Sequence, residues 1–271
     1  EIIHILEKQH INKGLTGIEY FADTRPPESE AEAIRKIGEV AGRLNAPVFI
    51  VHVSSKQGMD AIRSLRAKSV KVFCETRPHY LVLSSDNFSR KELAKFLIVP
   101  PIRSTTDQTD LLKGLQADEI QTIASDHFAQ RLNSKLENKN IAQPIMGLPG
   151  IESMLPLIHH FGVNKELIDY KQLVRLLSTN PAKIFGLFPQ KGSLEIGTDA
   201  DLIVFDPNRE VKLTKELLHS NAGFTAFEGI NVKGYPLMTF LRGKLLVNNG
   251  EMVESAKGGR FIKGKRSSLF N

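Results

Sequence analysis

The stretch Ala46-Pro47-Val48-Phe49-Ile50-Val51-His52-Val53-Ser54-Ser55 indicates the fold of the chain. Residues 48–53 are apolar and mostly β-branched apart from His52, which is typical of a parallel strand buried on both faces. Helix-like segments at 29–44 and 56–67 flank this strand. A helix, a buried strand and another helix form the repeat of an α/β barrel or a doubly wound sheet. The sequence therefore predicts an α/β protein.

His52 stands at the carboxyl end of this strand, which is the end that faces the active site in both architectures. A lone histidine there is most simply a core residue. Further strands are predicted at 70–76 and 120–124, and Asp126 follows the last of them. Imidazole nitrogen and carboxylate oxygen both bind zinc and similar divalent ions. At equivalent strand ends, His52 and Asp126 favour a metal-dependent hydrolase over a core histidine and a simple cap residue.

Composition narrows the class of protein. No apolar run reaches membrane-spanning length and no signal peptide is visible, so we expect a cytoplasmic protein without a membrane partner. The single cysteine, Cys74, excludes an internal disulfide framework and suits a reducing compartment. The net charge of +6 comes without a basic stripe interleaved with aromatic residues. This pattern argues against nucleic acid as a partner.

Local signals predict the ends of several elements. Ser29 is a plausible N-cap for the helix that begins there, and Thr106 or Asp107 for a helix at 110–116. Residues 129–146 are polar and lack periodicity, so we expect a mobile loop over the site.

The periodicity changes after residue 190. Strands are predicted at 201–206, 238–247 and 251–253, with Asn249-Gly250 as a hairpin turn. We therefore predict three parts: a barrel portion at 1–189, a small β domain at 190–255 and a basic tail at 256–271. The tail is interpreted as an extended arm on a neighbouring subunit, with a nucleic-acid-binding arm as the alternative.

Several motifs occur in an order seen in one family. They are Ile50-Val51-His52-Val53-Ser54-Ser55, Glu75-Thr76-Arg77-Pro78-His79-Tyr80, Pro100-Pro101-Ile102-Arg103, Ser125-Asp126-His127, Gly147-Leu148-Pro149-Gly150 and Ser178-Thr179-Asn180-Pro181. With them the chain resembles the cyclic amidohydrolases from Glu1 to about Phe261. The similarity is greatest to dihydropyrimidinases and hydantoinases, with allantoinase and dihydroorotase as more distant relatives.

The resemblance implies a fold and a chemistry. The fold is the C-terminal part of a metal-dependent, TIM-like (β/α)8 barrel, followed by a portion of a small β-sandwich. Two divalent ions, usually Zn with Mn or Co as alternatives, share a bridging hydroxide that opens a dihydropyrimidine or hydantoin ring. His52 matches a ligand of one ion. Asp126 matches the aspartate that binds the other ion and carries the proton.

Parts of the family pattern are absent from this sequence. A His-x-His pair, a carboxylated lysine that bridges the metals and a further histidine are expected upstream of Glu1. The N-terminal half of the barrel is therefore expected elsewhere, either because the chain is a fragment or because another polypeptide supplies it. The chain alone is expected to be inactive, and the complete protein to form a homo-oligomer, a tetramer or a dimer.

The resemblance also marks positions near the substrate. Val99 and Met146 match positions whose backbone contacts the ring, although both replace polar residues common in hydantoinases. Arg77 contacts an anion or forms a salt bridge to Glu75 or Asp126. His127 is predicted to hydrogen-bond a metal ligand.

Other functions stay open. Dihydroorotase and allantoinase are the alternatives within the enzyme class, and a non-catalytic dihydropyrimidinase-like scaffold is the alternative outside it. His52 and Asp126 favour the enzyme, because a scaffold needs neither ligand.

Overall fold

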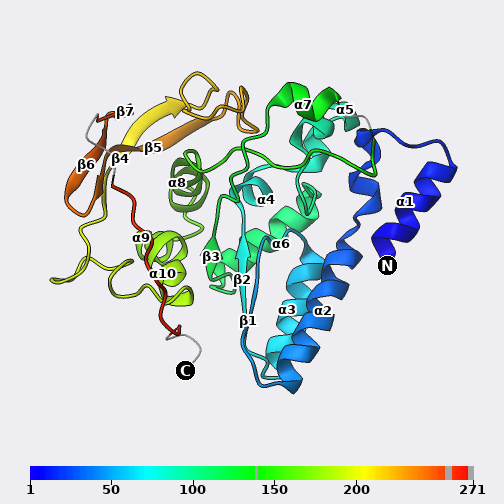
Figure 1. The fold of residues 1–271 in the computed structure, drawn as a ribbon, viewed down its shortest axis with the longest axis horizontal. Helices are drawn as coiled ribbons and strands as arrows, with labels where there is room; N and C mark the ends of the chain where they lie inside the picture. Colours follow the sequence, from blue (N-terminus) through cyan, green and yellow to red (C-terminus); the bar gives the residue numbers. More distant parts are fainter. Residues whose placement is uncertain (138–139, 254–257, 268–271) are drawn as a thin grey trace. The chain divides into compact units, whose positions relative to one another are not determined.

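A computed structural model describes residues 1–137, 140–253 and 258–267. The chain forms two compact units (Figure 1). Unit 1 comprises Glu1–Met154 and Thr214–Gly229, and unit 2 comprises Leu155–Leu213 and Ile230–Asn271. These limits differ from the predicted boundary at residue 190 between a barrel portion and a small β domain. That boundary stays a prediction.

A parallel sheet organises unit 1. Its strands β1 (Val48–Ile50), β2 (Val72–Thr76) and β3 (Thr122–Ile123) lie in the order β1-β2-β3. Val48 pairs with Val72 and Thr76 with Ile123, both in parallel register. Helices α2 (Pro27–Arg43), α3 (Lys56–Ala67) and α6 (Thr105–Gln116) alternate with the strands along the chain. The predicted α/β class is confirmed.

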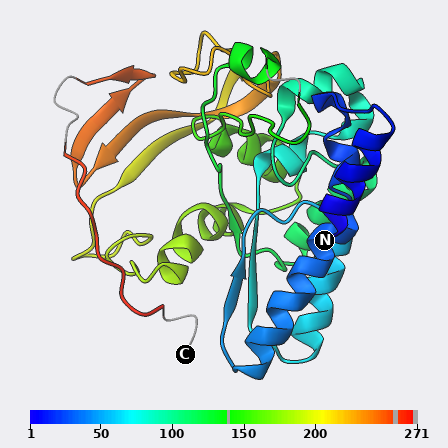
Figure 2. The same cartoon turned by 45° about the vertical axis from the view of Figure 1, so that its right-hand side comes forward.

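Helices α2 and α3 lie side by side in both views (Figures 1 and 2). The buried positions of α2 recur every three or four residues and form one apolar face: Ala31, Ile34, Gly38 and Ala41. A Cβ atom at Gly38 would lie 2.2 Å from the Leu65 side chain on α3. Glycine at this position therefore permits the close approach of the two helices.

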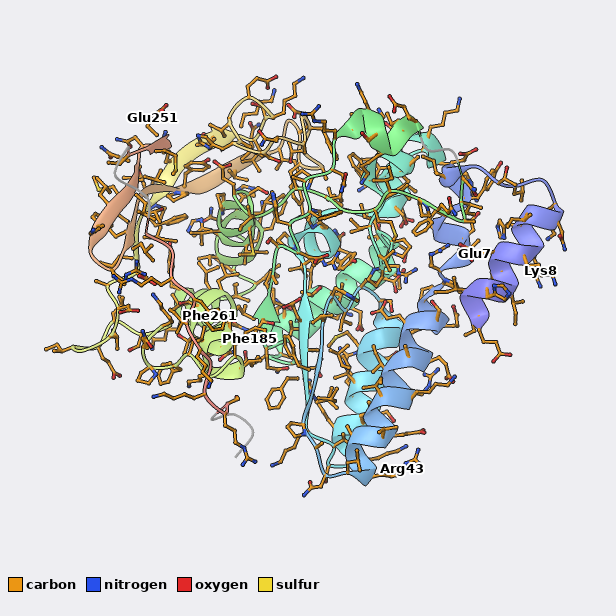
Figure 3. The ribbon with its side chains drawn as sticks, viewed as in Figure 1. Glu7, Lys8, Arg43, Phe185, Glu251 and Phe261 are labelled. Carbon is orange, nitrogen blue, oxygen red and sulfur yellow. The ribbon has the colours of Figure 1, made fainter. Side chains whose placement is uncertain are left out.

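The remaining elements of unit 1 are short apart from the first helix. They are α1 (Ile2–Asn12), η1 (Ile18–Tyr20), η2 (Ala22–Thr24), α4 (Pro78–Val82), η3 (Ser85–Asn87), α5 (Arg90–Leu93), η4 (Ala94–Phe96) and α7 (Leu132–Glu137). Glu7, labelled in Figure 3, lies on α1. Its carboxylate pairs with Arg25, which ties the first helix to the loop before α2.

Three local predictions are wrong. The N-cap of α2 is Pro26 rather than Ser29, whose hydroxyl donates to the Pro26 carbonyl oxygen at 2.7 Å. The N-cap of α6 is Ser104 and the helix begins at Thr105, so the predicted caps Thr106 and Asp107 lie inside its first turn. The polar stretch 129–146 contains the helix α7, apart from residues 138 and 139, which lie outside the described part.

Strand β2 carries the only cysteine of the sequence. Cys74 is buried opposite Ile50 of β1, and its backbone N–H donates to the Gln121 side chain at 3.0 Å. Arg66 of α3 donates to the same Gln121 side chain at 2.8 Å. Burial raises the pKa of the Cys74 thiol to about 11.

The sheet of unit 1 ends in open edges. Among the described strands, β1 and β3 each pair on one side only. Apolar side chains of α2 and of the residue after β1 are exposed beside β1, namely Ile37 and Val51. A groove of about 370 Å³ lies there, lined mainly by α2, β1 and the Val99–Pro101 loop. We call it the β1 groove.

Unit 2 combines helical turns with an antiparallel sheet. Its helical elements are α8 (Met154–Ile158), which starts at the end of unit 1, the π-helices η5 (His159–Val163) and η6 (Arg175–Thr179), and the short helices α9 (Tyr170–Val174) and α10 (Asn180–Ile184). The sheet has the order β4 (Leu202–Lys212), β5 (Asn231–Leu241), β6 (Lys244–Asn248) and β7 (Glu251–Met252).

The β hairpins show one confirmed turn and one that was missed. Asn249-Gly250 connects β6 to β7 as predicted, with positive φ angles of 49° and 90°. The strand predicted at 238–247 is broken by a second turn at Arg242-Gly243, whose φ angles are 48° and 77°. In the tail, the Lys265 N–H donates to the Gly186 carbonyl oxygen at 2.8 Å, so this part lies on unit 2 of its own chain. Residues 256–257 and 268–271 of the predicted tail lie outside the described part.

Candidate active site

Two potential metal ligands follow strands of the same sheet. His52 comes two residues after β1, and Asp126 comes three residues after β3. Both have a left-handed backbone, with φ angles of 47° and 42°. This conformation is uncommon for residues other than glycine and is often found at functional sites. The parallel strands bring both residues to the carboxyl edge of the sheet.

The environment of His52 favours its neutral form. The side chain is half-buried, and burial is the largest cause of its lowered pKa. The charge of Arg77 lowers this pKa further, while that of Asp126 raises it. His52 therefore interacts electrostatically with both groups. A neutral imidazole offers the lone pair that a metal ligand needs.

Arg77 pairs with Asp126. The Arg77 side chain is only 4% exposed, while that of Asp126 is 56% exposed. Of the partners considered from the sequence, the structure therefore selects Asp126 over Glu75. The Nε atom of Arg77 is buried and has no hydrogen-bond partner among the described residues. A permanent positive charge thus lies against the carboxylate that the family resemblance assigns to a metal.

Glu75 on β2 is a further acidic group of the site, considered from the sequence only as a salt-bridge partner of Arg77. It is half-buried, and burial raises its pKa. Its carboxylate accepts a hydrogen bond from the backbone N–H of His52 and feels the charges of Arg77 and Asp126. Glu75 lies near the carboxyl end of β2, the strand between β1 and β3. This position is the sequence signal that could have indicated a site residue.

His79, which follows Arg77 in the sequence by two residues, is buried. It lies on α4 with its ring 4.9 Å from that of Phe227, centroid to centroid. Burial, and then the charge of Arg77, lower its pKa to about 3. His79 is therefore a neutral packing residue close to the site.

His127 anchors a neighbouring loop. Its Nδ1 atom accepts hydrogen bonds from the backbone N–H groups of Gly150 (3.2 Å) and Ile151 (3.3 Å). His127 also forms an isolated parallel bridge with Leu148. The hydrogen bond from His127 to a metal ligand stays a prediction, and Nε2 is the ring atom left to make it.

The two predicted substrate-contacting positions lie in segments that touch each other. Val99 and Met146 are both exposed, whereas Ile98, directly before Val99, and Leu148, two residues after Met146, are buried. The Gly147 N–H donates to the Leu97 carbonyl oxygen at 2.9 Å, which links the two segments through their backbones. The contacts of Val99 and Met146 with a substrate stay predictions.

Lys135 was missed entirely. It lies on α7, and its side chain is fully buried against the carbonyl groups of Leu97 and Gly147. A single lysine in a polar stretch carries no sequence signal for burial, since its partners are carbonyl groups distant in the sequence.

The donor set of the site has the chemistry of a metal site but is small. In residues 1–137, 140–253 and 258–267, no three His, Cys, Asp or Glu side chains are grouped closely enough to hold an ion. His52 and Asp126 supply one nitrogen and one carboxylate, a combination that suits zinc. Any ion bound here needs further donors from outside these residues.

Comparison with known proteins decides the family. A sequence profile described as the amidohydrolase family matches residues 4–246. The chain belongs to the amidohydrolase family. This amidohydrolase chain is 34% identical over 265 residues to a D-hydantoinase of Ralstonia pickettii, covering 96% of the chain and 58% of the relative. It is 36% identical over 264 residues to a D-phenylhydantoinase of Escherichia coli, covering 95% and 56%.

Solved structures agree with these relatives. The amidohydrolase chain is similar to the crystal structure of a dihydropyrimidinase from Brevibacillus agri, with a TM-score of 0.91 and 33% identity. The similarity covers 97% of this chain and 58% of that structure. The chain thus spans somewhat more than half the length of the relatives it matches. Within the part that the structure describes, no helix is both long and apolar enough to span a bilayer.

Proposed function

We propose that the full-length protein hydrolyses a C–N bond of a neutral cyclic amide, as expected of a dihydropyrimidinase or hydantoinase. The observation that carries this proposal is the placement of His52 and Asp126 at the carboxyl edge of one parallel sheet, within mutual electrostatic reach. Relatives named hydantoinase and dihydropyrimidinase support the reaction class.

In the proposed reaction, His52 and Asp126 help to hold one or two divalent ions, Zn or else Mn or Co. Such an ion, when bound, lowers the pKa of water and polarises the scissile carbonyl. The neutral imidazole of His52 donates its lone pair. A carboxylate oxygen of Asp126 accepts the proton of the attacking water and delivers it to the ring nitrogen as the C–N bond breaks.

The remaining strands of the proposed barrel and the missing ligands belong to residues outside this chain. The β1 groove and the one-sided pairing of β1 support this view. A parallel edge strand with apolar neighbours needs a further strand and its helices to cover it. We extend the proposal to a composite β-sandwich around β4–β7 and to a homo-oligomer.

The Arg77–Asp126 pair favours a second candidate, a non-catalytic scaffold. A carboxylate neutralised by a buried guanidinium is less available to a metal ion or a proton than a free one. In such a protein the fold persists while the site holds no ion tightly.

A substrate panel separates the candidates. Dihydrouracil, hydantoin, allantoin and dihydroorotate are incubated with the full-length protein and added Zn²⁺ or Mn²⁺, and ring opening is followed. We expect dihydrouracil or hydantoin to be turned over fastest. Faster turnover of dihydroorotate or allantoin would assign the alternative enzymes, and no turnover of any ring would support the scaffold.

A further inference from the structure

Lys135 is buried with no counter-ion among residues 1–137, 140–253 and 258–267. Its ammonium donates to the carbonyl oxygens of Leu97 at 3.0 Å and Gly147 at 2.5 Å, and lies 5.8 Å from the centroid of the Phe224 ring. Burial lowers its pKa to about 8, and no charge among the described residues offsets that effect. A fully buried lysine without an acidic partner is rare because desolvation of the ammonium is costly. Such an arrangement calls for a functional reason.

The two carbonyl groups belong to different segments. Leu97 lies two residues before Val99, and Gly147 directly follows Met146. The Leu97 carbonyl oxygen also accepts from the Gly147 N–H at 2.9 Å, so the segments are tied twice. Gly147 has a φ of 115°, and a Cβ atom there would lie 2.4 Å from the Phe128 ring. A side chain at this position would therefore be both strained and crowded, which explains the glycine.

We propose that Lys135 is a positioning residue for substrate binding, because its ammonium holds the 97–99 and 146–147 segments in one geometry. The backbone groups of Val99 and Met146 then meet the cyclic amide in a fixed arrangement. This inference rests on the proposed function and on the family resemblance, which predicts that those two positions contact the ring. Lysine suits the role because several donors on one atom reach both carbonyls, and charge-assisted hydrogen bonds are about twice as strong as neutral ones.

Steady-state kinetics of Lys135→Met in the full-length protein test the proposal. Methionine retains an unbranched apolar stem but removes the ammonium that donates to both carbonyl groups. We expect KM to rise about 10-fold, with kcat changed less than about threefold, because the lost interaction positions the ring rather than the reacting water. Lys113→Met on the exposed surface of α6 is the matched control and leaves both constants unchanged. A fall in kcat with an unchanged KM overturns the proposal.

The pH dependence of KM provides a readout that a purely structural lysine would not move. As pH rises through about 8, the wild-type ammonium loses its charge and KM increases. Lys135→Arg keeps its charge and lacks this increase. Within the described residues, His79 is the titratable group that responds to Lys135, and with a pKa of about 3 it stays neutral in this range. An equal alkaline increase in both proteins contradicts the proposal.

Hydrogen exchange tests whether Lys135 holds the two segments together, an arrangement that we call the clamp. This measurement does not depend on enzymatic activity. The exchange rate of the Gly147 amide in Lys135→Met is compared with that in the wild type. If the methionine variant does not fold, Lys135→Arg is measured at neutral pH instead. We expect faster exchange in Lys135→Met and wild-type exchange in Lys135→Arg and Lys113→Met. Faster exchange in a protein that opens no cyclic amide would refute the proposed function but retain the clamp. Wild-type exchange in Lys135→Met, or loss of protection in Lys135→Arg, overturns the clamp whatever the activity.

Discussion

Replacing Arg77 by methionine should strengthen divalent-ion binding by the full-length protein. The guanidinium of Arg77 is buried and pairs with Asp126, so an ion that approaches this carboxylate must compete with a fixed positive charge. Two unit charges about 4 Å apart attract by about 4 kcal/mol at an effective dielectric constant of 20, and by about 1 kcal/mol in water. Because the Asp126 side chain is 56% exposed, the relevant value lies toward the lower end.

We take the contribution of the pair as roughly 1–2 kcal/mol, which corresponds to about 5- to 30-fold in the dissociation constant. Calorimetric titration of the metal-free, full-length protein with Mn²⁺ measures this constant. Arg77→Lys is the matched control, since it keeps the charge and should bind Mn²⁺ about as weakly as the wild type. Unchanged or weaker binding in Arg77→Met would refute the reasoning, and weaker binding would show that Arg77 supports the ion.

Three further outcomes follow from other parts of the structure. Glu30→Ala should lower the free energy of unfolding by about 3–5 kcal/mol in urea, because Glu30 accepts from the Ser54 N–H at 2.8 Å and lies 3.6 Å from the buried guanidinium of Arg103. The exposed control Glu32→Ala should stay within about 0.5 kcal/mol of the wild type, and equal losses would contradict this role. Because the folded pKa of Lys135 lies below the ordinary value of 10.5, the unfolded protein binds more protons between pH 8 and 10.5. The difference in unfolding free energy between the wild type and Lys135→Met should therefore be constant below pH 8 and should rise by up to roughly 3 kcal/mol above it. Denaturation at several pH values measures this difference. A difference that falls above pH 8 would be inconsistent with a buried ammonium. The 271-residue chain expressed alone should aggregate or bind the absent half through its open sheet edges, as measured by light scattering, whereas a monomer with a sharp unfolding transition would argue against this.

The strands of unit 1, and the placement of His52 and Asp126 after two of them, were predictable because their signals are local. The apolar run before His52 and the strand before Asp126 mark the carboxyl edge of a parallel sheet from the sequence alone. Helix α3 also has the predicted limits, since Ser55 accepts from the Gly58 N–H at 3.0 Å as a cap. Such features depend on neighbours within a few residues.

The features that were missed depend on residues distant in the sequence. Lys135 is buried by a carbonyl group 38 residues away, so its polar surroundings in the sequence indicated a loop. The partner of Arg77 stayed open because Glu75 and Asp126 are equally plausible until the strands are placed in register. The Arg242-Gly243 turn was hidden because arginine rarely adopts a left-handed backbone, so the flanking apolar residues looked like one strand.

The buried position of Cys74 gives the protein a natural probe of its own assembly. A thiol whose pKa is raised to about 11 and which has no exposed surface is almost unreactive toward alkylating reagents at neutral pH. Because it is the only cysteine of the sequence, any labelling of this chain reports the opening of β2 beside β1. The labelling rate would therefore distinguish a chain whose β1 edge is covered from one whose edge opens freely, without an introduced dye or a mutation.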